Sequence, residues 1–299
     1  MNLGYCCINL TLNKKGVTTN RTMRKATFLQ KGISYASELS LQNVQDLKKI
    51  IQWNIDHNIK VFRITSDLFP WASEYSLSDL PDYKSISSVL YECGKMAKAA
   101  NLRLSAHPGH FVKLASAGEE VVQNSIKDLE VHSKFFDLMG LEASYWNPLN
   151  IHVGCSFSKE VSDRFCQNFS RLSPNLQKRL VVENDDKESC YPVEQLLETI
   201  TDKIGTPITF DYFHHSFHSQ EIPEGDAARL AAKTWNGIKP LFHYSDSKNI
   251  YEGAKGNPRA HADHIYNKIS EHVDCDIDLE AKAKELALLD YYKKIEASN

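Results

Sequence analysis

The chain has 299 residues, of which 42% are hydrophobic, and a formal net charge of −3. This length allows one large α/β barrel or two ordinary domains, and the charge argues against non-specific binding of polyanions by the whole surface. No run approaches the ~20 apolar residues of a membrane span. The first residues lack the charged and apolar regions of a signal peptide. We therefore expect a soluble, cytoplasmic protein with no membrane partner.

The seven cysteines are odd in number and include no C-x-x-C spacing. Cys6 and Cys7 lie inside an apparent buried strand. Small buried thiols in a reducing compartment explain this usage better than disulfides.

The first elements show a strand, a loop and a helix. Leu3 to Leu10 is a continuous apolar run, typical of a strand buried on both faces. Thr11 to Gln30 is predicted as a long polar loop that carries basic residues and no acid. Ser40 is a suitable helix cap, and apolar residues follow it at helical spacing until Asn58 ends the helix.

The same alternation continues to the end of the chain. Strands are predicted at 60–65, 102–106, 150–153, 179–182, 208–210, 239–244 and 275–279. Helices are predicted at 85–100, 119–139, 157–169, 192–201, 223–235 and 261–273, and a Lys-rich helix closes the chain. Eight such units predict parallel strands in a (β/α)8 TIM barrel, as a single domain over residues 1–299. A doubly wound open sheet is the alternative, but no G-x-G-x-x-G is present.

Acids and histidines stand at the carboxyl ends of six predicted strands: His107, His152, Glu183, Asp211 with His214, His243, and Glu280. Each of them alone fits a hydrogen-bonded core histidine or a salt bridge as well as a ligand. Closure of a barrel, however, would gather all six tips at one face. With His261 there are eight donors, too many for one tetrahedral ion. The count predicts a cluster of two or three divalent cations.

The chemistry of these donors narrows the cofactor and the reaction. A mixed His, Asp and Glu shell suits Mn²⁺ or Zn²⁺. The tips carry no cysteine, so the strongest zinc-specific signal is absent. Multimetal sites of this kind catalyse in-line displacement at phosphorus.

Short motifs in order along nearly the whole chain resemble the ultraviolet damage endonuclease family, single-domain TIM barrels akin to endonuclease IV. They are Leu3-Gly4-Tyr5 with Asn9, Thr19-Asn20-Arg21-Thr22 with Arg24, Phe62-Arg63, His107-Pro108-Gly109, Glu183-Asn184-Asp185, Asp211 with His214-His215, and Leu279-Glu280-Ala281-Lys282. The resemblance implies a DNA repair enzyme that nicks the phosphodiester bond immediately 5′ of cyclobutane dimers or 6-4 photoproducts.

The resemblance also implies a cofactor and a ligand set. The cofactor would be a cluster of two or three divalent cations, Mn²⁺ before Zn²⁺, Mg²⁺ or Co²⁺. One metal would be held by His107, His152 and Glu183, and a second by Glu183, Asp211, His243 and Glu280. A third would be held by His214 and His261. The catalytic residues would be Glu183, His107, Asp211 and Glu280, around a metal-bound hydroxide that attacks the phosphorus.

The implied partner is damaged double-stranded DNA, bound by a monomer. The residues assigned to contact DNA or the lesion are Tyr5, Asn9, Arg21, Arg24, His110, Phe111 and His215. Two positions depart from the family pattern. His110-Phe111 stands where the family has Gln-Tyr, and Leu241 stands where some members have a Lys.

Two other functions compete with this interpretation. A sugar isomerase or epimerase on the same barrel would also use His, Glu and Asp with a divalent metal, but it has little use for a long basic first loop. A non-catalytic damaged-DNA binding protein would not need the full ring of ligands.

Overall fold

Eight parallel strands form the centre of the fold over the part of the chain that the structure, a computed structural model, describes, which is residues 1–298. They are β1 (Leu3–Cys7), β2 (Val61–Ile64), β3 (Arg103–Ala106), β4 (Leu149–Ile151), β5 (Leu180–Glu183), β6 (Ile208–Thr209), β7 (Leu241–Tyr244) and β8 (Asp276–Leu279). Their order is β6-β5-β4-β3-β2-β1-β8-β7, so neighbours in sequence pair with each other except β6 and β7, and β1 pairs with β8. The predicted barrel is therefore confirmed.

The barrel closes between β6 and β7 by one isolated bridge. Asp211 and His243 pair in parallel there, and the His243 amide donates to the Phe210 carbonyl at 2.9 Å. The closing contact therefore lies at the carboxyl ends of the strands, where ligands bind in this type of fold.

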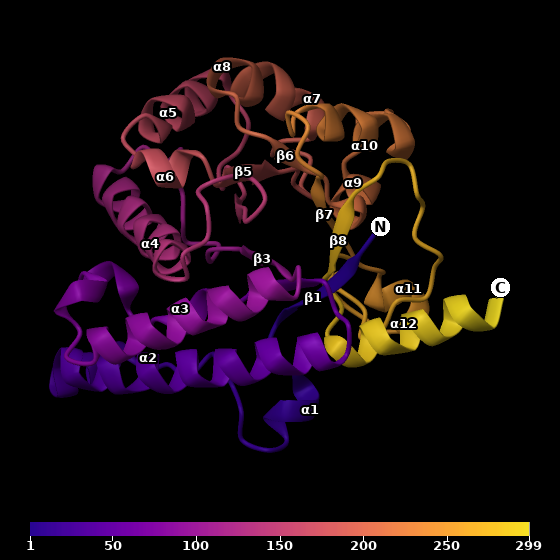
Figure 1. The fold of residues 1–299 in the computed structure, drawn as a ribbon. Coiled ribbons are helices and arrows are strands. Elements are labelled where there is room, and N and C mark those ends of the chain that lie inside the picture. Colours follow the sequence, from indigo (N-terminus) through magenta and orange to yellow (C-terminus); the bar gives the residue numbers. More distant parts are fainter. Residues whose placement is uncertain (299) are drawn as a thin grey trace.

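Helices surround the barrel (Figure 1). The long ones are α2 (Lys25–Asp56), α3 (Tyr83–Ala99), α4 (Glu119–Leu138), α5 (Lys159–Phe169), α10 (Glu224–Lys233) and α12 (Glu285–Ser298). The short ones are α1 (Leu10–Asn13), α6 (Pro174–Gln177), α7 (Val193–Leu196), α8 (Asp202–Ile204), α9 (Tyr212–Phe217) and α11 (Lys248–Glu252), with the single turns η1 (Ser66–Leu68), η2 (Ala72–Glu74), η3 (Leu77–Asp79) and η4 (Leu197–Thr201). A large apolar core packs the strands against the inner faces of the helices.

Two predicted elements are wrong. The first helix begins at Lys25 instead of Ser40, and Ser40 lies inside it, where its hydroxyl donates to the Ala36 carbonyl at 2.7 Å. A kink at Gly32, whose φ of 67° is open to glycine, separates the first turns from the rest. Residues 261–273 form irregular structure, because His261 and the segment after it pair with the β7 loop instead.

Two further features bear on the predictions above. All seven cysteines are free, as predicted. Among the described residues, no helix combines the length and the apolar character needed to cross a bilayer.

Candidate metal centre

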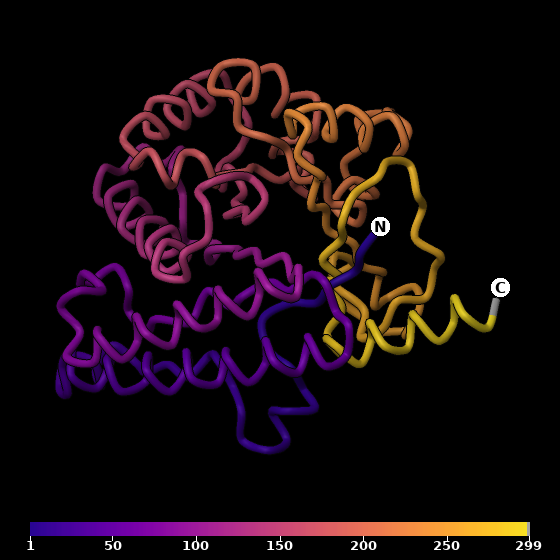
Figure 2. The backbone as a smooth tube through the Cα atoms, in the orientation of Figure 1, coloured from indigo at the N-terminus to yellow at the C-terminus, as the bar shows by residue number. Residues whose placement is uncertain are grey.

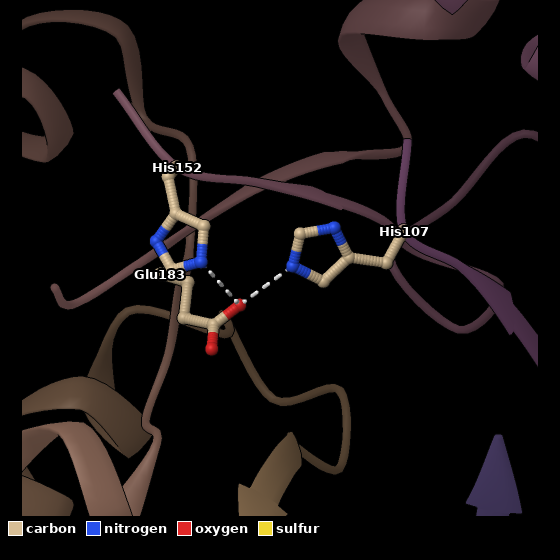
Figure 3. A group of neighbouring side chains, drawn as sticks. All are labelled: His107, His152 and Glu183. Carbon is tan, nitrogen blue, oxygen red and sulfur yellow. Dashed lines mark hydrogen bonds and ion pairs between the residues drawn. The ribbon is translucent and has the colours of Figure 1, made fainter. Parts of the chain in front are cut away.

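Glu183, the last residue of β5, lies at the middle of the predicted ligands. Its Oε2 is 3.1 Å from His107 Nε2 and 3.7 Å from His152 Nε2, and Figure 3 shows both rings pointing at this one oxygen. Its Oε1 is 3.1 Å from His243 Nδ1 and 3.4 Å from His214 Nδ1. Each carboxylate oxygen thus faces two imidazoles, the arrangement expected of a carboxylate that bridges two cations.

Two groups of three donors are tight enough to hold an ion. The first is His107, His152 and Glu183, and the second is Glu183, Asp211 and His243, each with donor atoms within 4.8 Å of one another. They share Glu183. They reproduce the first predicted ligand set in full and three of the four residues of the second.

Asp211 is fixed by its neighbours at the tip of β6. It is the N-cap of α9, and its Oδ1 accepts the His214 amide at 2.8 Å. The Asn184 side chain bonds both the amide and the carbonyl of Asp211, at 2.8 and 3.0 Å. The remaining oxygen, Oδ2, is therefore oriented but accepts no hydrogen bond, with His214 Nδ1 at 3.9 Å.

Glu280, just after β8, has a different partner. Its Oε1 lies 2.5 Å from Arg63 Nη1 and 3.4 Å from His243 Nδ1, and its Oε2 lies 3.7 Å from His261 Nδ1. The predicted third pair is looser, since the rings of His214 and His261 are 6.4 Å apart. All eight predicted ligands nevertheless face one space.

The charges of the centre depend on one another. Burial opposes ionisation of Glu183, but His243, His152 and His107 hold the pKa of this carboxyl well below its usual range. Arg63 and His243 likewise outweigh burial and lower the pKa of Glu280. Burial raises the pKa of Asp211 to about 6, although His214 opposes the shift.

The imidazoles fall into two classes. Burial lowers the pKa of His107 and of His261. Burial acts in the same direction on His243, but the carboxylates of Glu183 and Glu280 raise its pKa to about 9. Asp211 and Glu183 in the same way raise the pKa of His214 to about 10. A cation that enters must therefore displace protons from two of the rings.

Unpaired buried atoms test whether divalent cations fit this centre. Asp211 Oδ2, His152 Nδ1 and His261 Nδ1 are buried without a hydrogen-bond partner. Such atoms cost free energy in a folded protein unless a ligand or water satisfies them. The donors are oxygen and nitrogen with no thiolate, which matches Mn²⁺ or Zn²⁺. The residues present fit the predicted cofactor.

The supporting roles of three residues were missed in the sequence, although Arg63 and Asp185 belong to the motifs quoted above. Asn150 donates its amide to Glu183 Oε2, Asp185 Oδ2 lies 3.6 Å from His152 Nδ1, and Arg63 pairs with Glu280. Asn150 stands two residues before His152, so the period of a strand gives the signal that both face the barrel interior. Arg63 has no comparable signal, because its partner is 217 residues away.

The residues assigned to DNA contact separate into two groups. His110 and Phe111 are exposed, Phe111 by 59%, and Arg24 is exposed as well. Gly109 leaves room for the Phe111 ring, because a Cβ there would lie 2.5 Å from the ring and push this exposed side chain aside. These three residues are available to a duplex.

Three of the other assigned side chains are buried in this structure, and the fourth, Arg21, is half-buried in an ion pair. Tyr5 and Asn9 are fully buried, and the Tyr5 hydroxyl, which accepts from the Asn9 amide at 3.0 Å, donates to Asn54 Oδ1 at 2.7 Å. His215 is buried with its Nε2 at 3.0 Å from the Ile222 carbonyl. Arg21 pairs with Asp46 at 2.7 Å. In this conformation all four side chains bind other parts of the protein, and their contact with DNA stays a prediction.

Comparison with known proteins supports the family predicted from the motifs. A sequence model described as UV-endonuclease UvdE matches residues 1–299. The UV-damage endonuclease of Schizosaccharomyces pombe is 34% identical over 310 residues, which cover 99% of this chain and 51% of that protein. The chain thus spans about half the length of this relative. The crystal structure of SacUVDE matches with a TM-score of 0.86 and 33% identity, covering 100% of this chain and 99% of that one.

More distant structures share the fold alone. Endonuclease IV from Thermus thermophilus matches with a TM-score of 0.58 and 15% identity over 99% of this chain and 100% of that one. D-psicose 3-epimerase matches with a TM-score of 0.52 and 13% identity over 78% of each chain. The barrel alone therefore does not separate a nuclease from an epimerase. The sequence match over all residues does separate them, and the chain belongs to the UV-endonuclease UvdE family.

Proposed function

We propose that this chain is a DNA repair endonuclease that cuts the phosphodiester bond immediately 5′ of UV photoproducts in double-stranded DNA. Two or three divalent cations, with Mn²⁺ the best candidate, would be held by His107, His152, Glu183, Asp211, His214, His243, His261 and Glu280. Its relatives are named UV-damage endonucleases, and a single chain carries every donor the reaction needs, so we propose that it acts as a monomer.

The central position of Glu183 supports the proposal most directly. Each of its two carboxylate oxygens lies 3.1 to 3.7 Å from the nitrogens of two imidazoles. This arrangement suits a ligand that two ions would share. When bound, such ions lower the pKa of a water molecule and neutralise the oxygen that leaves phosphorus. No nucleophilic side chain is then required.

The protein's own residues hold this arrangement in place. Asn150 fixes one oxygen of Glu183, and Asn184 fixes the backbone of Asp211. Arg63 holds Glu280 toward the centre. Because these partners are set before substrate arrives, the donors would need little rearrangement during the reaction.

Exposed residues beside the centre would recognise the lesion. Phe111 can stack on a base or enter a distorted step, since stacking requires only an aromatic face. His110 would supply the polar contact. Arg24 would bind a phosphate of the same duplex away from the lesion.

Nicking of supercoiled plasmid tests the function. Irradiated plasmid should be nicked in the presence of Mn²⁺ in proportion to the UV dose, unirradiated plasmid should stay intact, and an end-labelled duplex should place the cut directly 5′ of the photoproduct. Nicking that depends on neither dose nor Mn²⁺ would contradict the proposal. Conversion of a ketose by the same preparation would support an epimerase, and lesion binding without any nicking would support a binding protein.

A further inference from the structure

The first 37 residues carry an unusual charge distribution. They contain six basic residues and no Asp or Glu, on a chain with a net charge of −3: Lys14, Lys15, Arg21, Arg24, Lys25 and Lys31. The structure uses one of them internally, since Arg21 pairs with Asp46. The others remain exposed. Three of these gather on one short segment, residues 24–31, which we call the α2 arm.

The α2 arm is an ordered part of the fold. It consists of the first turns of α2, set apart from the rest of the helix by the kink at Gly32. The Phe28 ring stacks on Trp71 with centroids 5.9 Å apart, and Trp71 Nε1 donates to the Met23 carbonyl at 2.9 Å. One side of the arm is thus attached to the loop after β2, which leaves the opposite side to solvent.

The arm lies on the same end of the barrel as the metal centre. It follows the carboxyl end of β1, and α2 then runs back to the amino end of β2. The helix after Gly32 is about 36 Å long, whereas a four-residue strand spans only about 13 Å. The start of α2 therefore projects beyond the strand ends. In Figures 1 and 2 its indigo end reaches the edge of the molecule away from both marked chain termini.

The exposed side of the arm combines cations with one apolar side chain. Arg24 and Lys25 are exposed and have no carboxylate partner within residues 1–298. Lys31 is exposed as well, with Nζ held 4.1 Å above the Tyr35 ring. Leu29 is 72% exposed. Phosphates alternating with sugar edges match this surface, whereas a single leucine is too little apolar area for a stable protein interface.

We propose that the α2 arm is a second contact for the DNA substrate, separate from the lesion contact. Arg24, Lys25 and Lys31 bind phosphates of the duplex that flanks the damaged site, and Leu29 packs against the sugar edge of the groove. The inference rests on the proposed nuclease function, because it takes duplex DNA as the ligand. It also predicts that binding improves when the duplex is long enough to reach the arm.

Salt dependence of DNA binding provides the test. The triple variant Arg24→Gln/Lys25→Gln/Lys31→Gln is compared with a charge-matched control, Lys95→Gln/Lys178→Gln/Lys233→Gln. These three exposed lysines lie near the end of α3, at the end of α6 and at the end of α10, each ahead of the amino end of a strand. Anisotropy titrations use a duplex with one photoproduct, with short or long flanks. For the long duplex, the slope of log Kd against log salt should be smaller by about 2 to 3 for the arm variant than for the wild-type protein. The control should match the wild-type protein.

Leu29→Ala separates the apolar contact from the charges. It should weaken binding of the long duplex roughly threefold to tenfold and leave the salt slope unchanged, because it removes no charge. A salt slope for the triple arm variant equal to that of the control, or equal losses on short and long duplexes, would overturn the proposal. Nicking of irradiated plasmid by the wild-type protein is scored in parallel, so failure of the arm is distinguished from failure of the nuclease function.

Discussion

Two buried charged clusters lie at opposite ends of the same barrel, and they differ in whether the protein completes them. At the amino end, Arg103 Nη1 pairs with Asp276 at 3.2 Å, and Lys239 pairs with the same carboxylate at 3.0 Å. Arg103 also donates to three backbone carbonyls. No polar atom of Arg103 or Asp276 lacks a partner in the described part of the chain.

The cluster at the carboxyl end is left incomplete. It holds the acids Glu183, Asp211 and Glu280 and one guanidinium, that of Arg63, with several buried atoms unpaired. Both clusters bury charge, yet within residues 1–298 only this one of the two leaves buried donor atoms without a hydrogen-bond partner, and we propose that cations bind there. The comparison assigns stability to the amino end and ligand binding to the carboxyl end, the division expected of this fold.

The largest effect should come from Glu183→Gln. It keeps the size of the side chain and removes the charge that two cations would share. Nicking should fall by more than about 100-fold, beyond the loss typical of an outer partner, and one Mn²⁺ equivalent should disappear in calorimetric titration. Affinity for damaged duplex should persist, since no phosphate contact is removed. A variant that still nicks at the wild-type rate would refute the bridging role.

Arg103→Met tests the other cluster. The change leaves Asp276 with Lys239 as its remaining cation, so it should lower the free energy of unfolding by about 3 kcal/mol, the lower end for breaking a buried pair. Urea unfolding measures this loss. The Mn²⁺ titration serves as the control and should be unchanged. Weakened Mn²⁺ binding without loss of stability would contradict the division between the two ends.

Dependence on pH should distinguish protons from cations at the centre. The pKa values of His243, about 9, and of His214, about 10, lie above the ordinary value near 6.5. In the metal-free protein their charge therefore contributes stability that is fully present below pH 6.5 and is lost as pH rises through 9 to 10.

Cation binding should show the opposite trend, because a ligating imidazole must be neutral. Affinity for Mn²⁺ should rise up to about tenfold per pH unit for each ring that loses a proton. Thermal unfolding with and without Mn²⁺ at pH 6.5 and 8.5 measures the difference. A smaller Mn²⁺ stabilisation at pH 8.5 would show that these rings are not ligands.

The smallest of these effects should come from Asp185→Asn. The Asp185 carboxylate lies 3.6 Å from His152 Nδ1, so it can orient the ring whose Nε2 faces Glu183. Mn²⁺ affinity should fall roughly tenfold, the lower end for loss of such a partner. Asp163→Asn, in an exposed ion pair with Lys203, is the matched control. Equal behaviour of the two variants would remove Asp185 from the centre.

The sequence predicted which side chains gather at the centre better than it predicted the residues that support them, for a physical reason. A strand tip can be located from local periodicity, and parallel topology then gathers all tips at one face, so His107, Glu183 and His243 were found without coordinates. The partner of a buried side chain depends on register around the barrel. The contact of Arg63 with Glu280 and the burial of Tyr5 were therefore not predictable.

The first helix shows a similar limit. Ser40 resembled a cap because serine often starts helices, but inside a helix the same hydroxyl can bond the carbonyl one turn earlier, as it does with Ala36. The residues before it lack apolar periodicity because the arm is exposed. The spacing of apolar residues therefore indicates where the helix enters the core, and not where the helix begins.

The closure of the barrel has a consequence of its own. β6 and β7 are joined by one short bridge, between Asp211 and His243, and both of these residues belong to one candidate cation group. An ion bound there would also hold β6 and β7 together where the barrel closes. Removal of the ion by a chelator should then weaken the contact between β6 and β7 before any other strand pairing. Faster amide hydrogen exchange in these two strands would report the change. The proposed nuclease activity and the stability of the closed barrel would then increase and decrease together.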